Sequence, residues 1–131
     1  MRKGFTLIEL LLAAVFLVFT ISAILMLFAN CIFLNATNRA ITIATSHAQG
    51  VMEEIRDTNF SAIEANINND YWDWDISTIE SKGFSVLPGE TIDTSKIGTG
   101  SNLLNVIVTV SWQGHSQRSE SISLETLLAE L

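Results

Sequence analysis

Glu9 is the only acidic residue before Glu53, and its position is the feature of the chain that could do chemistry. Two basic residues and a glycine precede it, and no further charged side chain occurs until Arg39. A carboxylate in the middle of a bilayer costs about 2.5–3.5 kcal/mol, and less near the interface. Glu9 could therefore lie at headgroup level, where a helix N-terminus favours an anion. Alternatively, it could pair with an amino group at the same depth.

A second group of carboxylates lies in the middle of the chain, at Asp70, Asp73 and Asp75, with Trp72 and Trp74 interspersed among them. Alternation places the tryptophans on the side that covers the protein and the acids on the side that faces water, which is the favoured interpretation. The alternative is a Ca²⁺ site, because Ca²⁺ takes several oxygen ligands. The spacing is not that of an EF-hand, so we expect no metal and keep calcium as the weaker hypothesis.

No catalytic motif is found elsewhere in the sequence, and we expect a protein that is not an enzyme. His47 and His115 are isolated from each other and from Cys31. We expect His47 to be a satisfied or partly exposed core histidine and Cys31 to be a small packing residue. The chain has 14 acidic and 7 basic residues, which argues against binding nucleic acid through a basic patch.

Residues 10–29 form an apolar run that only Thr20 and Ser22 interrupt. Twenty residues at about 1.5 Å each span the ~30 Å core of a bilayer, so we predict one membrane helix. The run exceeds the ~7–15 residues of the apolar h-region of a signal peptide, and no small-residue cleavage site closes it. Because the basic residues precede the helix, its N-terminus should stay cytoplasmic and the C-terminal part should be exported.

The segment from Arg2 to Leu10 resembles the leader junction of type IV prepilins and type II secretion pseudopilins. The resemblance implies that a prepilin peptidase recognises Lys3 and cuts between Gly4 and Phe5. It also implies that Phe5 becomes the N-methylated first residue. Glu9 would then be the fifth residue of the mature chain, where it would pair with the Phe5 amine of a neighbouring subunit during assembly.

Beyond the membrane, apolar residues recur with helical spacing from Ile43 to Ile55, which predicts an amphipathic second half of the same helix, ending near Asp57. Major pilins commonly carry a glycine and a proline in this helix, where the present chain has Val18 and Met26. We therefore expect a continuous helix, which favours a minor pilin or a pseudopilin over the main fibre subunit.

The C-terminal region predicts a β-hairpin. Valines alternate with other residues over 105–112, residues 113–116 form the turn, and residues 118–124 alternate again. Residues 84–87 are a candidate short strand, residues 66–70 a loop and residues 125–131 a candidate final helical turn. The end of the chain is similar to that of I-type minor pseudopilins and related minor pilins.

The prediction is an α+β pilin-like fold in which a long N-terminal helix packs against a small antiparallel sheet. Its expected parts are a cleaved leader (1–4), a transmembrane half-helix (5–34), an amphipathic half-helix (35–57) and a β-domain (58–131). The resemblance implies a minor subunit near the tip of a type IV pilus, a secretion pseudopilus or a DNA-uptake machine in the bacterial inner membrane. Expected partners are other pilin subunits, the prepilin peptidase, the assembly platform and lipid. The alternative is a single-pass anchored adhesin or ligand-binding domain that does not polymerise.

Overall fold

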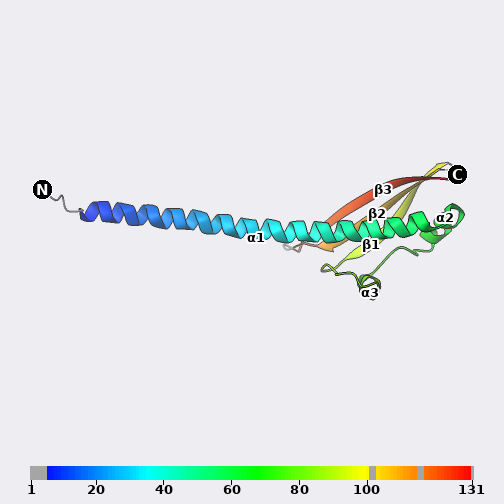
Figure 1. Ribbon diagram of the computed structural model, residues 1–131, viewed down its shortest axis with the longest axis horizontal. Helices are drawn as coiled ribbons and strands as arrows, with labels where there is room; N and C mark the ends of the chain where they lie inside the picture. Colours follow the sequence, from blue (N-terminus) through cyan, green and yellow to red (C-terminus); the bar gives the residue numbers. More distant parts are fainter. Residues whose placement is uncertain (1–5, 101–102, 115–116, 131) are drawn as a thin grey trace. The chain divides into compact units, whose positions relative to one another are not determined.

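The computed structural model describes residues 6–100, 103–114 and 117–130, and the fold is α+β as predicted (Figure 1). Three helices come first, and three strands follow. Their bounds are α1 Leu7–Asp57, α2 Phe60–Asn68, α3 Ile76–Ser81, β1 Thr91–Gly100, β2 Leu103–Gln113 and β3 Ser119–Ala129. The chain divides into two compact units, Met1–Ala36 and Thr37–Leu131.

The first unit is the apolar half of α1. Among the described residues, α1 is the one helix long and apolar enough to cross a membrane. Its 51 residues run without a break, which confirms the prediction of a continuous helix. Two hydroxyls in the apolar run bond back to the helix itself, Thr20 to the Leu17 carbonyl and Ser22 to the Val18 carbonyl. Such bonds allow a hydroxyl to be satisfied in lipid, which offers no partner.

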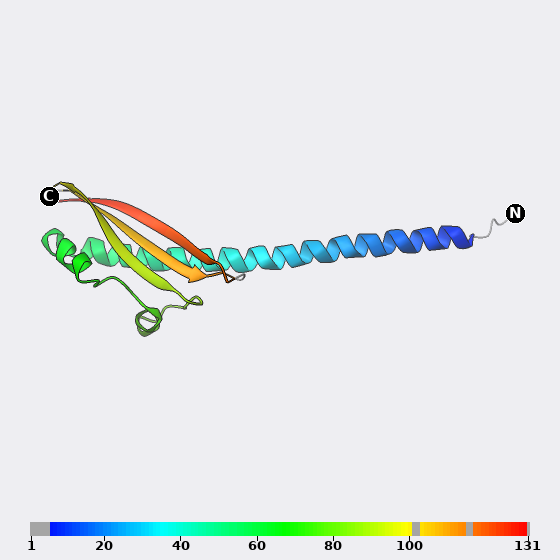
Figure 2. The ribbon, with the colours of Figure 1, turned by 180° about the vertical axis from the view of Figure 1, so that it is seen from behind.

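The second unit has its core between the later turns of α1 and one face of the sheet. The buried stripe of α1 lies where the helical spacing predicts it and consists of Ala44, His47, Ala48, Val51, Met52 and Ile55. Opposite it, the alternate residues Val106, Val108, Val110 and Trp112 of β2 are buried. Figures 1 and 2 show from opposite sides that the three strands lie along this half of α1.

The sheet is antiparallel with the strand order β1-β2-β3. Strand β2 pairs with β1 in the register Ile92–Val110 and with β3 in the register Val110–Ile122. The antiparallel pairing of the predicted hairpin is therefore confirmed, although β2 and β3 are longer than the alternating stretches suggested. Residues 115–116 of the predicted turn lie outside the described residues, and Gln113 belongs to β2. The sequence did not predict β1, which pairs through its backbone with the strongly apolar β2.

Three predictions in the second unit were wrong. Residues 66–68 end helix α2 instead of lying in a loop, and residues 76–81 form a further helix. Residues 84–87 form no strand. Residues 125–129 continue β3 instead of forming a helical turn, because pairing with residues 103–107 of β2 satisfies their backbone. Leu127 and Leu128 thus lie on opposite faces of a strand, with the period of two that a strand imposes.

Candidate functional site

The predicted assembly residue Glu9 lies in the first turn of α1, where it holds the helix start. Its Oε2 atom accepts the backbone N–H of Thr6 at 3.0 Å and the hydroxyl of Thr6 at 2.8 Å. In half of a capping box, a carboxylate on the third residue of a helix accepts the N–H of the residue just before the helix, as Glu9 does here with Thr6. The Thr-x-x-Glu spacing of residues 6–9 is the sequence signal for this cap, and sequence reasoning missed it.

Only one oxygen of Glu9 is used in this cap. Both hydrogen bonds end on Oε2, and Oε1 accepts none from the part of the chain described. Glu9 is also exposed. The carboxylate can therefore cap its own helix and still present an acceptor to a second group. The predicted processing residues Lys3, Gly4 and Phe5 lie outside the described residues.

The segment around the two tryptophans connects α2 to α3. Trp72 and Trp74 are buried whereas Asp73 and Asp75 are exposed, which confirms the predicted alternation. The segment is not a strand of the sheet, although Trp74 forms a backbone bridge to Ile92 of β1. Alternation of side chains was therefore predicted correctly, although the extended segment is only a few residues long.

Asp73 and Asp75 each accept a hydrogen bond from a backbone N–H of the second unit. Asp73 accepts the backbone N–H of Thr94 through Oδ1 at 2.7 Å. Partial burial raises the pKa of Asp73, this hydrogen bond opposes the rise, and the nearby charges of Asp93 and Asp70 add to it.

Asp75 is the N-cap of α3, where its Oδ1 accepts the N–H of Thr78 at 2.9 Å and the Thr78 hydroxyl at 2.7 Å. The Ser77 hydroxyl also donates to the carboxylate. The bonds from the Thr78 hydroxyl, the Thr78 N–H and the Ser77 hydroxyl together lower the pKa of Asp75 to about 2. Sequence reasoning assigned no such cap to Asp75.

The candidate calcium ligands Asp70, Asp73 and Asp75 are not gathered into one cluster in the described part of the chain. Among the described residues, no group of three or more His, Cys, Asp or Glu side chains is placed to hold a metal ion. Asp70 takes a positive φ of 54° at the turn after α2, which Asp tolerates better than most residues. The geometry assigns these carboxylates to a turn, a sheet contact and a helix cap.

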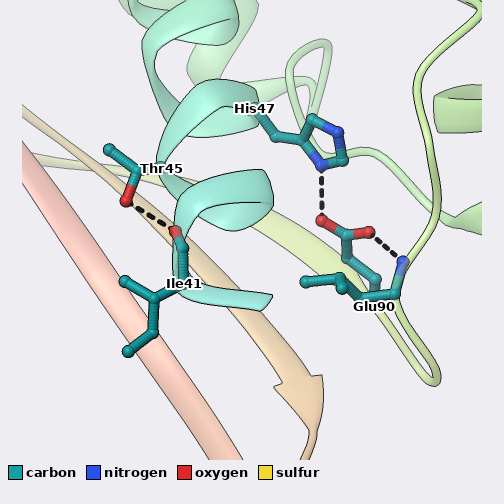
Figure 3. Close-up of polar contacts among 5 residues, drawn as sticks. Ile41, Thr45, His47 and Glu90 are labelled. Carbon is teal, nitrogen blue, oxygen red and sulfur yellow. Dashed lines mark hydrogen bonds and ion pairs between the residues drawn. The ribbon is translucent and has the colours of Figure 1, made fainter. Parts of the chain in front are cut away.

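His47 and Glu90 form a buried pair that sequence reasoning found only in part (Figure 3). His47 is 2 % exposed and Glu90 is 0 % exposed. The distance from His47 Nδ1 to Glu90 Oε1 is 2.6 Å, and Glu90 Oε2 accepts the N–H of Leu87 at 2.8 Å. The prediction of a satisfied core histidine is confirmed.

The pair ties helix α1 to the loop that precedes β1. The His47 and Phe84 rings meet edge to face, with 5.1 Å between their centroids. Phe84 and Glu90 of this loop thus contact His47 directly, and Leu87 holds Glu90 in place through its N–H. Glu90 follows Pro88-Gly89 in the sequence, and an acidic residue after such a turn is expected to be exposed. No spacing rule links it to a histidine 43 residues earlier.

Comparison with known proteins adds no relative. No family model matches the chain, and neither a curated protein nor a solved structure matches it. The pilin-like architecture therefore rests on the long apolar N-terminal helix and on the three-stranded antiparallel sheet that packs against it.

Proposed function

We propose that this chain is a structural, non-enzymatic subunit of a type IV pilus or a type II secretion pseudopilus. The observation that carries the proposal is the composition of α1. One unbroken helix begins with a capping carboxylate, continues through an apolar stretch long enough to cross a membrane, and ends in a stripe buried under an antiparallel sheet. A plain membrane anchor needs neither the carboxylate nor the continuity.

In this proposal, the prepilin peptidase cuts between Gly4 and Phe5, and the new amine becomes N-methylated. The helix then stays in the inner membrane with the second unit outside it, until the assembly platform adds the subunit to neighbouring pilins. The unbroken helix and the resemblance of the C-terminal end to I-type minor pseudopilins support a minor subunit near the tip.

The docking step follows from the chemistry of Glu9. Apolar helices gain little by packing side by side in lipid, because lipid tails are as apolar as leucine. A charge-assisted bond from the Phe5 amine of a neighbour to Glu9 gains more there and fixes the axial stagger. Glu9 Oε1 accepts no hydrogen bond from the described residues, which supports this step, since the bond needs no loss of the cap.

The first test is the intact mass of the chain extracted from membranes. We expect a chain that begins at Phe5 and carries one methyl group. A chain that still begins at Met1 would leave the anchored adhesin or ligand-binding domain as the better account, and a chain cut after about residue 29 would indicate an ordinary signal peptide.

The second test replaces Glu9 with Val, with Asp as the matched variant. Glu9→Val should leave insertion and cleavage intact and lower crosslinking to neighbouring subunits, whereas Glu9→Asp should lower it less. Native levels of crosslinking and function in the Val variant would refute the role of Glu9 in docking.

A further inference from the structure

Strand β3 forms an open edge of the sheet, whereas the opposite edge is partly closed. At the β1 edge, Trp74 and Ile92 exchange two backbone hydrogen bonds of 2.9 and 3.0 Å. The Thr94 N–H also donates to Asp73 at this edge. Figure 1 shows β3 on the side of the sheet away from β1 and α3, and no described strand pairs with its outer side. An edge strand presents a row of unpaired N–H and C=O groups.

The open edge lacks a bulge, a proline and a lysine, three of the features that commonly protect such strands. β3 has 11 residues and pairs with β2 without a register shift, so no bulge twists the edge away. It contains no proline, lysine or arginine, and its only charged residues are Glu120 and Glu125. Proteins usually block an exposed edge with a short strand, a bulge, a proline or a lysine. A long, regular edge without them is suited to pairing with another strand.

An apolar patch lies beside this edge on the outer face of the sheet. Ile97, Asn105 and Leu127 are neighbours across the three strands, and Ile97 is 52 % and Leu127 59 % exposed. The next residue of β2 on this face is Ile107. Farther along the same face, the cross-strand neighbours are serines, threonines, Asp93 and Gln113, so the apolar part is confined to one end.

The charge around the patch has one sign. Glu125 lies on the outer face beside Leu127 and accepts a hydrogen bond from the Asn105 amide. Asp93 lies on the same face, and no described residue of this face is basic. From residue 37 onward the sequence has 13 acidic and 5 basic residues. A surface that covers the patch would therefore gain from carrying lysine or arginine.

We propose that the edge of β3 receives a β-strand from a different protein, one in which aliphatic residues alternate and a lysine or arginine lies opposite Glu125. The added strand extends the sheet and covers Leu127 on the outer face and the half-buried Ile122 and Leu124 on the inner face. A second copy of this chain is not the occupant. Its own β3 would bring two further glutamates and no cation to the edge, and like charges across strands are destabilising.

This inference deepens the proposed function by naming the contact of the second unit, and it rests on that function only for placing the unit among other subunits. The test is photo-crosslinking of the full chain in its native membrane. A photoreactive amino acid is placed at Leu127 on the open edge or, as the matched control, at the exposed Thr91 on the β1 edge. We expect position 127, and not position 91, to crosslink to a strand of another protein that contains lysine or arginine.

The charge requirement is tested by Glu125→Lys in the chain labelled at 127. Replacing a cross-strand attraction with a repulsion should lower the crosslink about three- to tenfold. The control, Glu80→Lys on the exposed surface of α3, makes the same change in net charge and should leave the crosslink unchanged. Equal melting temperatures for both variants in detergent confirm that the loss is not caused by unfolding.

Four results would overturn the inference: a crosslink between two copies of this chain, a crosslink to lipid, no adduct at position 127, or an adduct that Glu125→Lys leaves intact. The N-terminal mass measured in the same samples separates this inference from the proposed function. A cleaved chain without the adduct refutes the strand contact alone, and an uncleaved chain with the adduct refutes the pilin role alone.

Discussion

Breaking the His47–Glu90 pair should destabilise the second unit more than any surface change. The informative variants are His47→Leu, Glu90→Gln and the double variant. They can be measured in the fragment from residue 37, because every buried residue in the described part of the chain, from Ala44 to Trp112, belongs to the second unit. The fragment thus keeps the whole core.

The size of the effect follows from burial. His47→Leu removes the partner of Glu90 Oε1 and leaves this fully buried side chain with the Leu87 N–H as its remaining hydrogen bond. Removal of one partner costs about 1–3 kcal/mol for a buried polar pair and about 3–5 kcal/mol where the remaining group is charged. Glu90→Gln removes the charge but keeps an oxygen for Leu87, so the cost should be about 1–2 kcal/mol. In the double variant no charge is buried, and the cost should be smaller than the sum of the two by about 1–3 kcal/mol.

Urea denaturation followed by circular dichroism measures these differences. With a slope of about 1–3 kcal/mol per M, His47→Leu should lower the midpoint by about 2 M. The matched control is Glu54→Gln, which breaks the exposed pair of 2.6 Å with Lys82 and should cost at most about 1 kcal/mol. If the effects of the two core substitutions add to within about 0.5 kcal/mol, His47 and Glu90 are not coupled, which would refute the predicted contribution of the pair to stability.

Four further predictions concern the same fragment. Asp75→Ala should lower the melting temperature at neutral pH, and the difference should vanish on acidification. The pKa of Asp75 falls from 3.8 to about 2 on folding, so its contribution to stability is present above pH 3.8 and is lost as the pH falls to about 2. Asp73→Asn should not destabilise the fragment at pH 7, since Asn still accepts the Thr94 N–H and is not repelled by Asp93 and Asp70. Millimolar Ca²⁺ should not raise the melting temperature of the unchanged fragment, and a rise would support the calcium hypothesis. Ile55→Ala, at a fully buried site, should cost about 2–5 kcal/mol in urea denaturation, and Ile41→Ala, at a site 40 % exposed, about 0.5 kcal/mol or less.

The parts of the fold that sequence reasoning predicted are those with a long, regular pattern. The stripe that ends at Ile55 repeats over several turns, and the alternation from Val106 to Trp112 repeats over a whole strand. Each pattern reports which side of one element is buried, and burial decides the packing of a helix on a sheet.

The parts it missed depend on partners distant in the sequence. β1 has a weak apolar pattern, with Asp93, Ser95 and Lys96 among its residues, and it is a strand because β2 supplies a ladder. Helix α3 has only 6 residues and owes its start to the Asp75 cap. Glu90 can be buried because it forms a hydrogen bond with His47, which lies in the core 43 residues earlier in the sequence. In each case tertiary context, not local propensity, determines the structure.

Glu9 illustrates how one side chain can have two roles that different substitutions separate. Its Oε2 caps α1 through Thr6, and the proposed docking contact uses the other oxygen. Glutamine at this position keeps a carbonyl oxygen for the Thr6 N–H, and a capping box accepts Gln as well as Glu. Glutamine lacks the negative charge that a neighbouring ammonium group requires.

We therefore expect Glu9→Gln to insert and to be cleaved like the native chain but to crosslink to neighbouring subunits as poorly as Glu9→Val. Glu9→Gln at the native level of crosslinking, with Glu9→Val impaired, would show instead that the cap alone matters. In that case Glu9 would act by ordering the first turn of the helix, and the register between subunits would have to come from the shapes of the apolar residues behind it.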